Sequence, residues 1–171
     1  MKKILLVLAL VAIIGAGTAF ADHPDGWGVG IVAGYNGNWY NALNHPNVAL
    51  SLKIPKIPIY WAFNLEIHNS HMGMGLRGDY YLLDKTLVPD IGLHWYIGLG
   101  GWVSLGFYHD TYIALGVRLP IGISWQLGLG GSLDALELFL EIAPSLGIQV
   151  SPDIYFPAGG WGAGFGVRLW F

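Results

Sequence analysis

The chain of 171 residues is 54% hydrophobic but only 11% charged, and it has 26 glycines and no cysteine. Soluble domains have about 25% charged residues, so a medium other than water must cover much of this surface. The formal net charge of −3 gives no electrostatic basis for holding phosphate backbones, which argues against nucleic-acid partners. The absence of cysteine excludes disulfides, thiolate metal sites and a lipidated N-terminal cysteine.

Residues 1–21 have the pattern of a secretory signal peptide. Lys2 and Lys3 form a basic start, residues 4–14 form an unbroken apolar run, and Ala19-Phe20-Ala21 fits the small-x-small cleavage pattern. The apolar run falls short of the roughly 18 residues that a membrane anchor needs. We expect export through the Sec pathway, cleavage after Ala21 and a mature domain of residues 22–171. Because Lys2 and Lys3 are lost, 6 basic residues then face 11 acidic ones, a net charge of −5.

The mature part has no apolar run of about 18 residues, which argues against helical membrane spans. In hydrocarbon every backbone polar group must be paired within the protein, so a closed barrel is the other spanning structure. Barrel strands alternate apolar residues on the outer face with small or polar residues on the inner face. In chain order, the segments with this alternation are 27–35, 48–54, 59–68, 72–82, 93–103, 113–127, 136–142 and 161–171. The sequence therefore predicts an all-β fold, an eight-stranded antiparallel up-and-down transmembrane β-barrel.

The sixth segment is the longest, and Pro120 lies in its middle. Proline cannot donate a hydrogen bond to a neighbouring strand, so we expect a bulge or a local break there. Turn chemistry separates the segments at 36–38, 55–58, 69–70, 84–85, 109–110, 130–132 and 151–153. If both ends of the barrel are periplasmic, the outer connections lie near 36–46, 68–71, 104–110 and 147–159, and none of them is long.

Charged residues within these segments fall on the inner face. A charge on the lipid face near the membrane centre costs about 2–4 kcal/mol, so a barrel requires this placement. We interpret the set as a structural salt-bridge cluster in the lumen, in preference to a catalytic acid/base set or a proton path, because eight-stranded barrels ordinarily fill their interiors with side chains. The residues are Glu66, Arg77, Asp79, Arg118, Glu137, Glu141 and Arg168.

Inward glycines leave room for bulky inward partners, among them Tyr60, Tyr81, Tyr96, Phe139 and Trp170. The same glycines are compatible with a narrow cavity, and the pattern alone leaves both alternatives open. Tryptophans on the outer face near strand ends are expected at the two membrane interfaces, where such barrels concentrate aromatic residues. They are Trp27, Trp61, Trp95, Trp125 and Trp161.

Three motifs suggest other chemistry and are weighed as weaker. Residues 73–78 have the spacing of a dinucleotide-binding fingerprint, but that motif requires a strand before it and a helix after it. A metal held by His68 and His71, with His45 or His109, lacks a carboxylate or thiolate at ligand spacing, and we expect no metal or other cofactor. A lipid-modifying enzyme would need a nucleophile beside a histidine. The pairs available are His68 with Ser70, and His109 with Thr111 beside Asp110.

The C-terminal segment 164–171 resembles the closing strand of bacterial outer-membrane barrels. The resemblance implies that the barrel assembly machinery recognises this end, with periplasmic chaperones acting earlier in biogenesis. By this resemblance the signal would comprise Phe165, Val167, Leu169 and the terminal Phe171. Segments 118–125 and 136–144 are similar to small barrels best known from spirochaetes, a group commonly compared with OmpA, OmpX and OmpW.

The leading hypothesis is a monomeric barrel in the outer membrane, in contact with lipid, with a structural or interaction role and no enzymatic activity. A narrow, porin-like conduit for small or hydrophobic solutes, which a likeness to OmpW would imply, is the alternative. A lipid-modifying enzyme is third.

Overall fold

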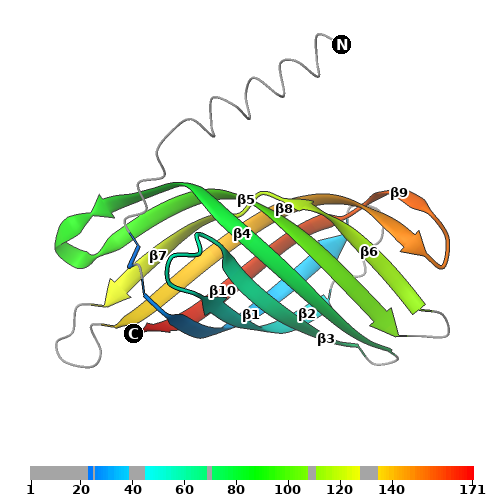
Figure 1. Ribbon diagram of the computed structural model, residues 1–171, viewed down its shortest axis with the longest axis horizontal. Coiled ribbons are helices and arrows are strands. Elements are labelled where there is room, and N and C mark those ends of the chain that lie inside the picture. Colours follow the sequence, from blue (N-terminus) through cyan, green and yellow to red (C-terminus); the bar gives the residue numbers. More distant parts are fainter. Residues whose placement is uncertain (1–22, 25, 39–44, 69–70, 108–110, 128–134) are drawn as a thin grey trace, which may run out of the picture.

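The structure, a computed structural model, describes residues 23–24, 26–38, 45–68, 71–107, 111–127 and 135–171 (Figure 1). Within these ranges the strands form one antiparallel sheet that closes on itself. The elements are β1 (Gly28–Asn38), β2 (His45–Lys53), β3 (Tyr60–His68), β4 (His71–Val88), the 3-10 turn η1 (Pro89–Ile91), β5 (Leu93–Phe107), β6 (Thr111–Arg118), β7 (Ile121–Leu127), β8 (Leu136–Ser151), β9 (Tyr155–Ala158) and β10 (Gly160–Trp170).

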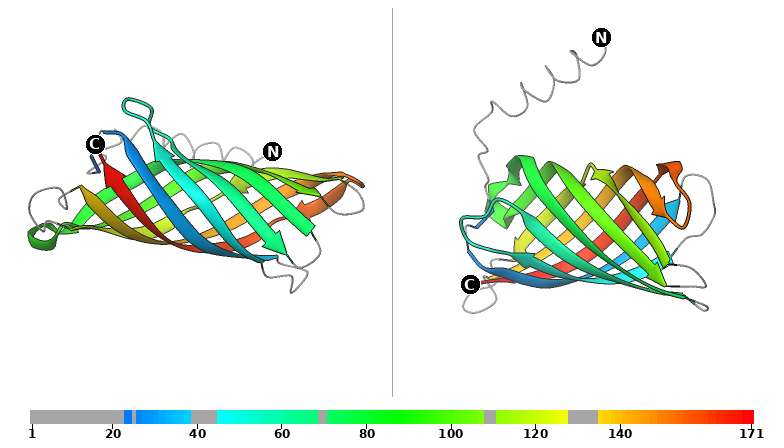
Figure 2. Two further views of the ribbon diagram at one scale, coloured as in Figure 1. Left: turned by 90° about the horizontal axis from the view of Figure 1, so that it is seen from below. Right: turned by 45° about the vertical axis from the view of Figure 1, so that its right-hand side comes forward.

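The first and last strands close the barrel. β1 pairs with β10 along its whole length, from Gly28 opposite Trp170 to Asn38 opposite Gly160, and with β2 on its other side. Beyond the strands, the backbones of Trp27 and Phe171 exchange two hydrogen bonds of 3.1 and 2.8 Å. Figure 2 shows the resulting cylinder of steeply inclined strands, with the end of β10 beside the start of β1. Closure pairs both edges of the sheet, so neither edge is left to accept another strand.

In the described part of the chain, ten strand segments form eight continuous strands of the barrel wall. We call each of these continuous strands a stave. β6 and β7 both pair with β5 and with β8, and the register on each side is the same before and after Pro120. β9 and β10 likewise lie along β8 as successive parts of one stave. The predicted all-β, eight-stranded antiparallel up-and-down barrel is confirmed, and the interruption at Pro120 is a break without a bulge.

The two faces of the wall differ as period-two alternation requires. Outward residues such as Ile31 and Leu115 are 62% and 44% exposed, whereas their inward neighbours Val32 and Ala114 are 2% and 0% exposed. Large apolar side chains thus cover the outside of the cylinder, and the inward side chains fill its interior.

Some predicted turns are strand instead. Residues 36–38 end β1, and residues 84–85 continue β4, whose hairpin with β5 turns at η1 and at Gly92 with φ of 64°. A bulge between Tyr81 and Leu83 reverses the alternation in β4. Leu83 therefore points outward with 47% exposure and Asp84 inward with 2%. β8 also extends to Ser151, which shortens the last outer connection to the β8–β9 turn.

Residues 73–78 lie inside β4, opposite β3 and β5, and the same strand continues after them to Val88. This excludes the strand-turn-helix context of a dinucleotide site. Among the described residues, no helix has the length and apolar character to span a bilayer. The predicted signal peptide, with its cleavage after Ala21, lies outside the described residues.

Inward glycines are a tight fit to the aromatic interior, and Gly122 provides a test. A Cβ at Gly122 would overlap the Tyr96 ring and lie 2.7 Å from the Leu140 carbonyl oxygen, whereas a Cβ at the outward Gly101 would meet nothing closer than 3.7 Å. We expect Gly122→Ala to lower the free energy of unfolding by about 1–3 kcal/mol through overpacking. Urea unfolding of the refolded barrel, followed by tryptophan fluorescence, measures this. Gly101→Ala is the matched control, and an equal loss in both variants would contradict this account.

Candidate functional site

Three tyrosines from neighbouring strands stack across the lumen. The ring centroids of Tyr60 and Tyr81 are 4.1 Å apart and those of Tyr81 and Tyr96 are 4.2 Å apart, each pair within 13° of parallel. All three side chains are buried. Stacked aromatic pairs contribute about 0.5–1.5 kcal/mol each beyond the area that they bury. The stack crosses the lumen, with Tyr96 in contact with one group of charged residues and Tyr60 in contact with another.

The first group, the Arg118 cluster, lies near the middle of the barrel and comprises Arg118, Asp79 and Glu141. Arg118 reaches the Asp79 carboxylate at 3.0 Å and that of Glu141 at 2.5 Å, and the Tyr96 hydroxyl donates to Glu141 at 3.1 Å. The Arg118 side chain is 6% exposed. Because β4, β6 and β8 each supply one member, the cluster ties three staves together from within.

The second group, the Arg168 cluster, lies nearer the chain ends and comprises Arg168, Glu137 and His23. Arg168 binds Glu137 at 2.7 Å, and the Trp170 indole N–H donates to the same carboxylate at 2.8 Å. The guanidinium also lies 4.9 Å from the Tyr60 ring centroid and donates to Ser51 at 3.1 Å. A buried arginine thus has a charged, a hydroxyl and an aromatic partner, which offsets the cost of removing it from water.

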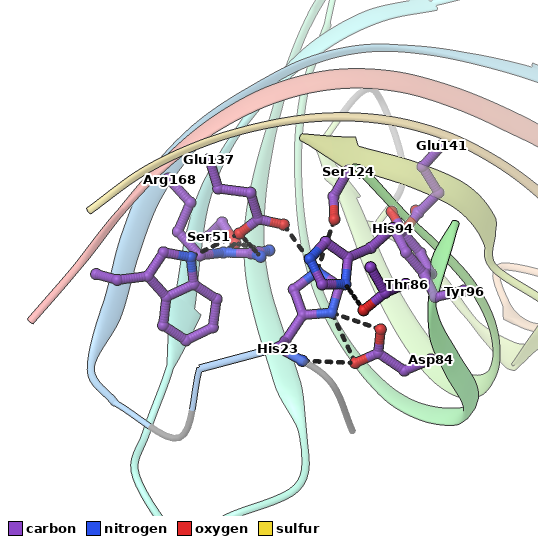
Figure 3. A network of polar contacts seen from close by, with 11 residues as sticks. His23, Ser51, Asp84, Thr86, His94, Tyr96, Ser124, Glu137, Glu141 and Arg168 are labelled. Carbon is purple, nitrogen blue, oxygen red and sulfur yellow. Dashed lines mark hydrogen bonds and ion pairs between the residues drawn. The ribbon is translucent and has the colours of Figure 1, made fainter. Parts of the chain in front are cut away.

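His23, from the segment before β1, inserts its imidazole between two carboxylates (Figure 3). Its Nδ1 lies 2.6 Å from Asp84, and its Nε2 lies 3.1 Å from Glu137 and 2.7 Å from Ser124 Oγ. The ring packs against the tyrosine stack and lies 5.2 Å from that of His94. His23 therefore fills the interior at the end of the barrel that holds Phe171.

The environment of His23 favours its charged form. Burial alone would lower the pKa of His23, but hydrogen bonds and charge from Asp84 and Glu137 outweigh burial and raise this pKa to about 9. At neutral pH His23 is therefore an imidazolium, with an N–H donor on each ring nitrogen. Its positive charge balances the carboxylates around it.

Ser124, His23 and Asp84 have the spacing of a nucleophile, a base and an orienting acid. A general base must be neutral to accept the serine proton, and this imidazolium is not. The side chains of Ser124, His23 and Asp84 are also almost fully buried. His23, Asp84 and His94 bring their ligand atoms within 4.8 Å of one another, as a metal site would. The same positive charge already occupies that position, so we interpret the arrangement as a structural ion network.

The lumen is filled at the level of the tyrosine stack. The cavity there has a volume of about 10 Å³ and is bordered by Arg77, Asp79 and Glu141 on one side and Arg168 and Tyr60 on another. A volume of this size holds about one water molecule. A solute larger than water would have to displace side chains to pass.

The structure places the predicted lumen charges in three settings. Asp79, Arg118, Glu137, Glu141 and Arg168 meet in the two clusters, and Arg77 borders the small cavity between them. Glu66 stands apart toward the other end of the barrel, where its carboxylate accepts a hydrogen bond of 3.0 Å from Asn36.

Sequence analysis missed four members of the network, namely Asp84, Ser124, His94 and His23. Asp84 was assigned to a turn, and the bulge in β4 is what points it inward. Ser124 was on the inner face without a role, and His94 shared that face in its strand. His23 precedes the first strand, where no periodicity exists to indicate its direction. The loop pairs His68 with Ser70 and His109 with Thr111 involve side chains outside the described residues.

The predicted interfacial tryptophans lie at both ends of the barrel. Trp27, Trp61, Trp95 and Trp125 share the end that holds Phe171, as the pairing of β3, β5 and β7 requires. Trp161 begins β10 at the opposite end, where its ring is 6.2 Å from that of Tyr35.

One of three comparisons with known proteins bears on the fold. No protein-family model matches the chain, and no curated protein matches it. Among solved structures, the chain is similar to the crystal structure of Neisserial surface protein A (NspA), with a TM-score of 0.53 and 11% sequence identity. The alignment covers 85% of this chain and 97% of NspA. At this identity the likeness shows a shared fold.

Removal of one charge from the Arg168 cluster tests the ion network. We expect Arg168→Met to cost about 3–5 kcal/mol of unfolding free energy, because Glu137 loses its guanidinium partner inside the barrel. Adding Glu137→Gln to this variant should restore part of the loss, since the uncompensated carboxylate is then gone. Urea titrations of the single and double variants give both values. If the double variant is no more stable than the sum of the two single changes predicts, the pairing is not what stabilises this region.

The raised pKa of His23 makes its contribution depend on pH. A histidine whose pKa is higher in the folded than in the unfolded state stabilises the fold fully below pH 6.5, and this contribution disappears as pH rises through 9. The shift corresponds to roughly 3 kcal/mol. We expect the stability difference between the native chain and His23→Gln to be largest near pH 6 and small at pH 9.5. A difference that stays constant over this range would show that His23 carries no charge in the fold.

Proposed function

We propose that this protein is an integral outer-membrane barrel with a sealed interior and a structural or surface-contact role. Residues 1–21 direct Sec export and are removed, and the mature barrel faces lipid as a monomer. The outward Phe165 and Leu169, with Val167 and the terminal Phe171, present the end of β10 to the assembly machinery. Exposures of 50% for Phe165 and 77% for Phe171 support their accessibility.

One observation carries this proposal: the apolar residues are outside and the ions are inside. Outward residues such as Leu50, Phe63 and Ile142 are 51–56% exposed, while Glu137 and Arg168 are 1% and 2% exposed. In water this arrangement would leave a large apolar surface unprotected. In a bilayer the same surface is matched to its solvent, and a closed sheet leaves no strand edge unpaired.

The filled lumen supports a structural or surface role over the solute conduit. Two ion clusters and the tyrosine stack leave space for about one water molecule at mid-barrel. The likeness to a surface protein is in keeping with this role. Nothing in the described residues favours the lipid-modifying enzyme, since the serine of the Ser124–His23–Asp84 arrangement is sealed from substrate.

Planar bilayers test the sealed lumen directly. We expect the refolded mature barrel to insert but to give no stable conductance steps. As a positive control, Tyr60→Ala with Tyr81→Ala and Tyr96→Ala removes the stack and should produce detectable current. Steady channels from the native barrel would overturn the sealed-lumen proposal and favour the conduit. Fractionation of cells that express the full chain tests the outer-membrane location separately.

A further inference from the structure

Two prolines weaken the barrel wall at one level. Pro120 lies between β6 and β7, and Pro144 lies on β8 across from Leu119. Leu119 N–H donates to the Pro144 carbonyl at 2.9 Å, and Gly98 N–H donates to the Pro120 carbonyl at 2.8 Å. Neither proline has an N–H to return these bonds, so the carbonyls of Leu119 and Gly98 lose their ladder donors. The pairing of the β6–β7 stave with β5 and its pairing with β8 therefore each lack one hydrogen bond at the same level. We call these two positions the weakened seams.

A groove lies on the outer face over this position. Its volume is about 350 Å³, and its lining is Val117, Arg118, Leu119, Pro144, Ser145 and Leu146. Val117, Leu119 and Leu146 are 56%, 39% and 47% exposed, so their side chains form the walls. Arg118 directs its guanidinium inward to Asp79 and Glu141. The outward Gly101 lies beside Val117 in the sheet and adds no side chain there.

We propose that this groove binds one hydrocarbon chain of a membrane lipid. The inference rests on the proposed membrane location. The groove is continuous with the apolar outer wall, since Leu115, Ile123 and Leu140 surround it with 44–53% exposure. The outward side chains that line it offer neither charge nor hydrogen-bonding groups, so they match an acyl chain and not a headgroup.

The groove also lies over the two positions where the wall lacks hydrogen bonds. A carbonyl without a protein donor attracts water, and water is costly within hydrocarbon. A chain seated across Leu119 and Pro144 keeps water from the weakened seams. It packs on the backbone of Arg118, the residue that anchors the central ion cluster.

Native mass spectrometry provides the test. The mature barrel is reconstituted into vesicles of phosphatidylethanolamine and phosphatidylglycerol, extracted in mild detergent and sprayed intact. We expect the native barrel to retain one phospholipid. Leu119→Trp and Leu146→Trp fill the groove from different strands and should lower the retained fraction at least about tenfold, since each lost methylene contact weakens binding about fourfold. Ile123→Trp, outward but outside the groove, is the matched control and should retain the lipid.

The outcomes separate the two proposals. Heat-dependent gel mobility and vesicle flotation report folding and insertion for every variant, and a native barrel that does not insert would overturn the membrane proposal itself. If it inserts but retains no lipid, or if the groove variants retain as much as the control, the lipid site is wrong. If a second copy of the barrel is retained and both groove variants lose it, the groove is a protein interface instead.

Discussion

Pairing of β1 with β10 is the interaction on which the rest of the structure depends. It joins the two ends of the chain along eleven residue pairs and removes both edges of the sheet. Once the sheet is closed, every inward side chain shares one narrow interior and every outward side chain faces the surroundings. The apolar outside and the polar inside are then two consequences of the same closure.

Buried charges in the interior are paired with nearby charges of opposite sign. In the contacts around Arg118, the guanidinium pairs with Asp79 and Glu141, and Arg77 borders the same cavity as these two carboxylates. Around Arg168, the cations Arg168 and His23 face Glu137 and Asp84. Arg118, Arg168 and His23 each have an opposite partner close by, which limits the desolvation cost of several kcal/mol per unpaired ion. His23 is the member that comes from outside the strands, so the N-terminal segment completes the interior.

The barrel wall is interrupted at Pro120 and Pro144. The register of β7 on both neighbours continues that of β6, so the break does not change the topology. It costs two hydrogen bonds, because neither proline has an N–H to donate to the neighbouring strand. The wall therefore has fewer backbone hydrogen bonds at this position. Inside the barrel, the ion pairs of the Arg118 cluster link the same staves.

The sequence by itself determined the number of staves, the apolar outer face, the break at Pro120 and the inward direction of residues such as Glu137 and Arg168. All of these follow from parity along a strand, which is a local property. Only the tertiary structure decided which charges meet, because Arg118 and Asp79 are 39 residues apart and the register between strands brings them together. It also decided the roles of Asp84 and His23. One bulge turns Asp84 inward, and His23, 114 residues from Glu137, lies before any periodic segment and is positioned by contacts that exist only in the closed barrel.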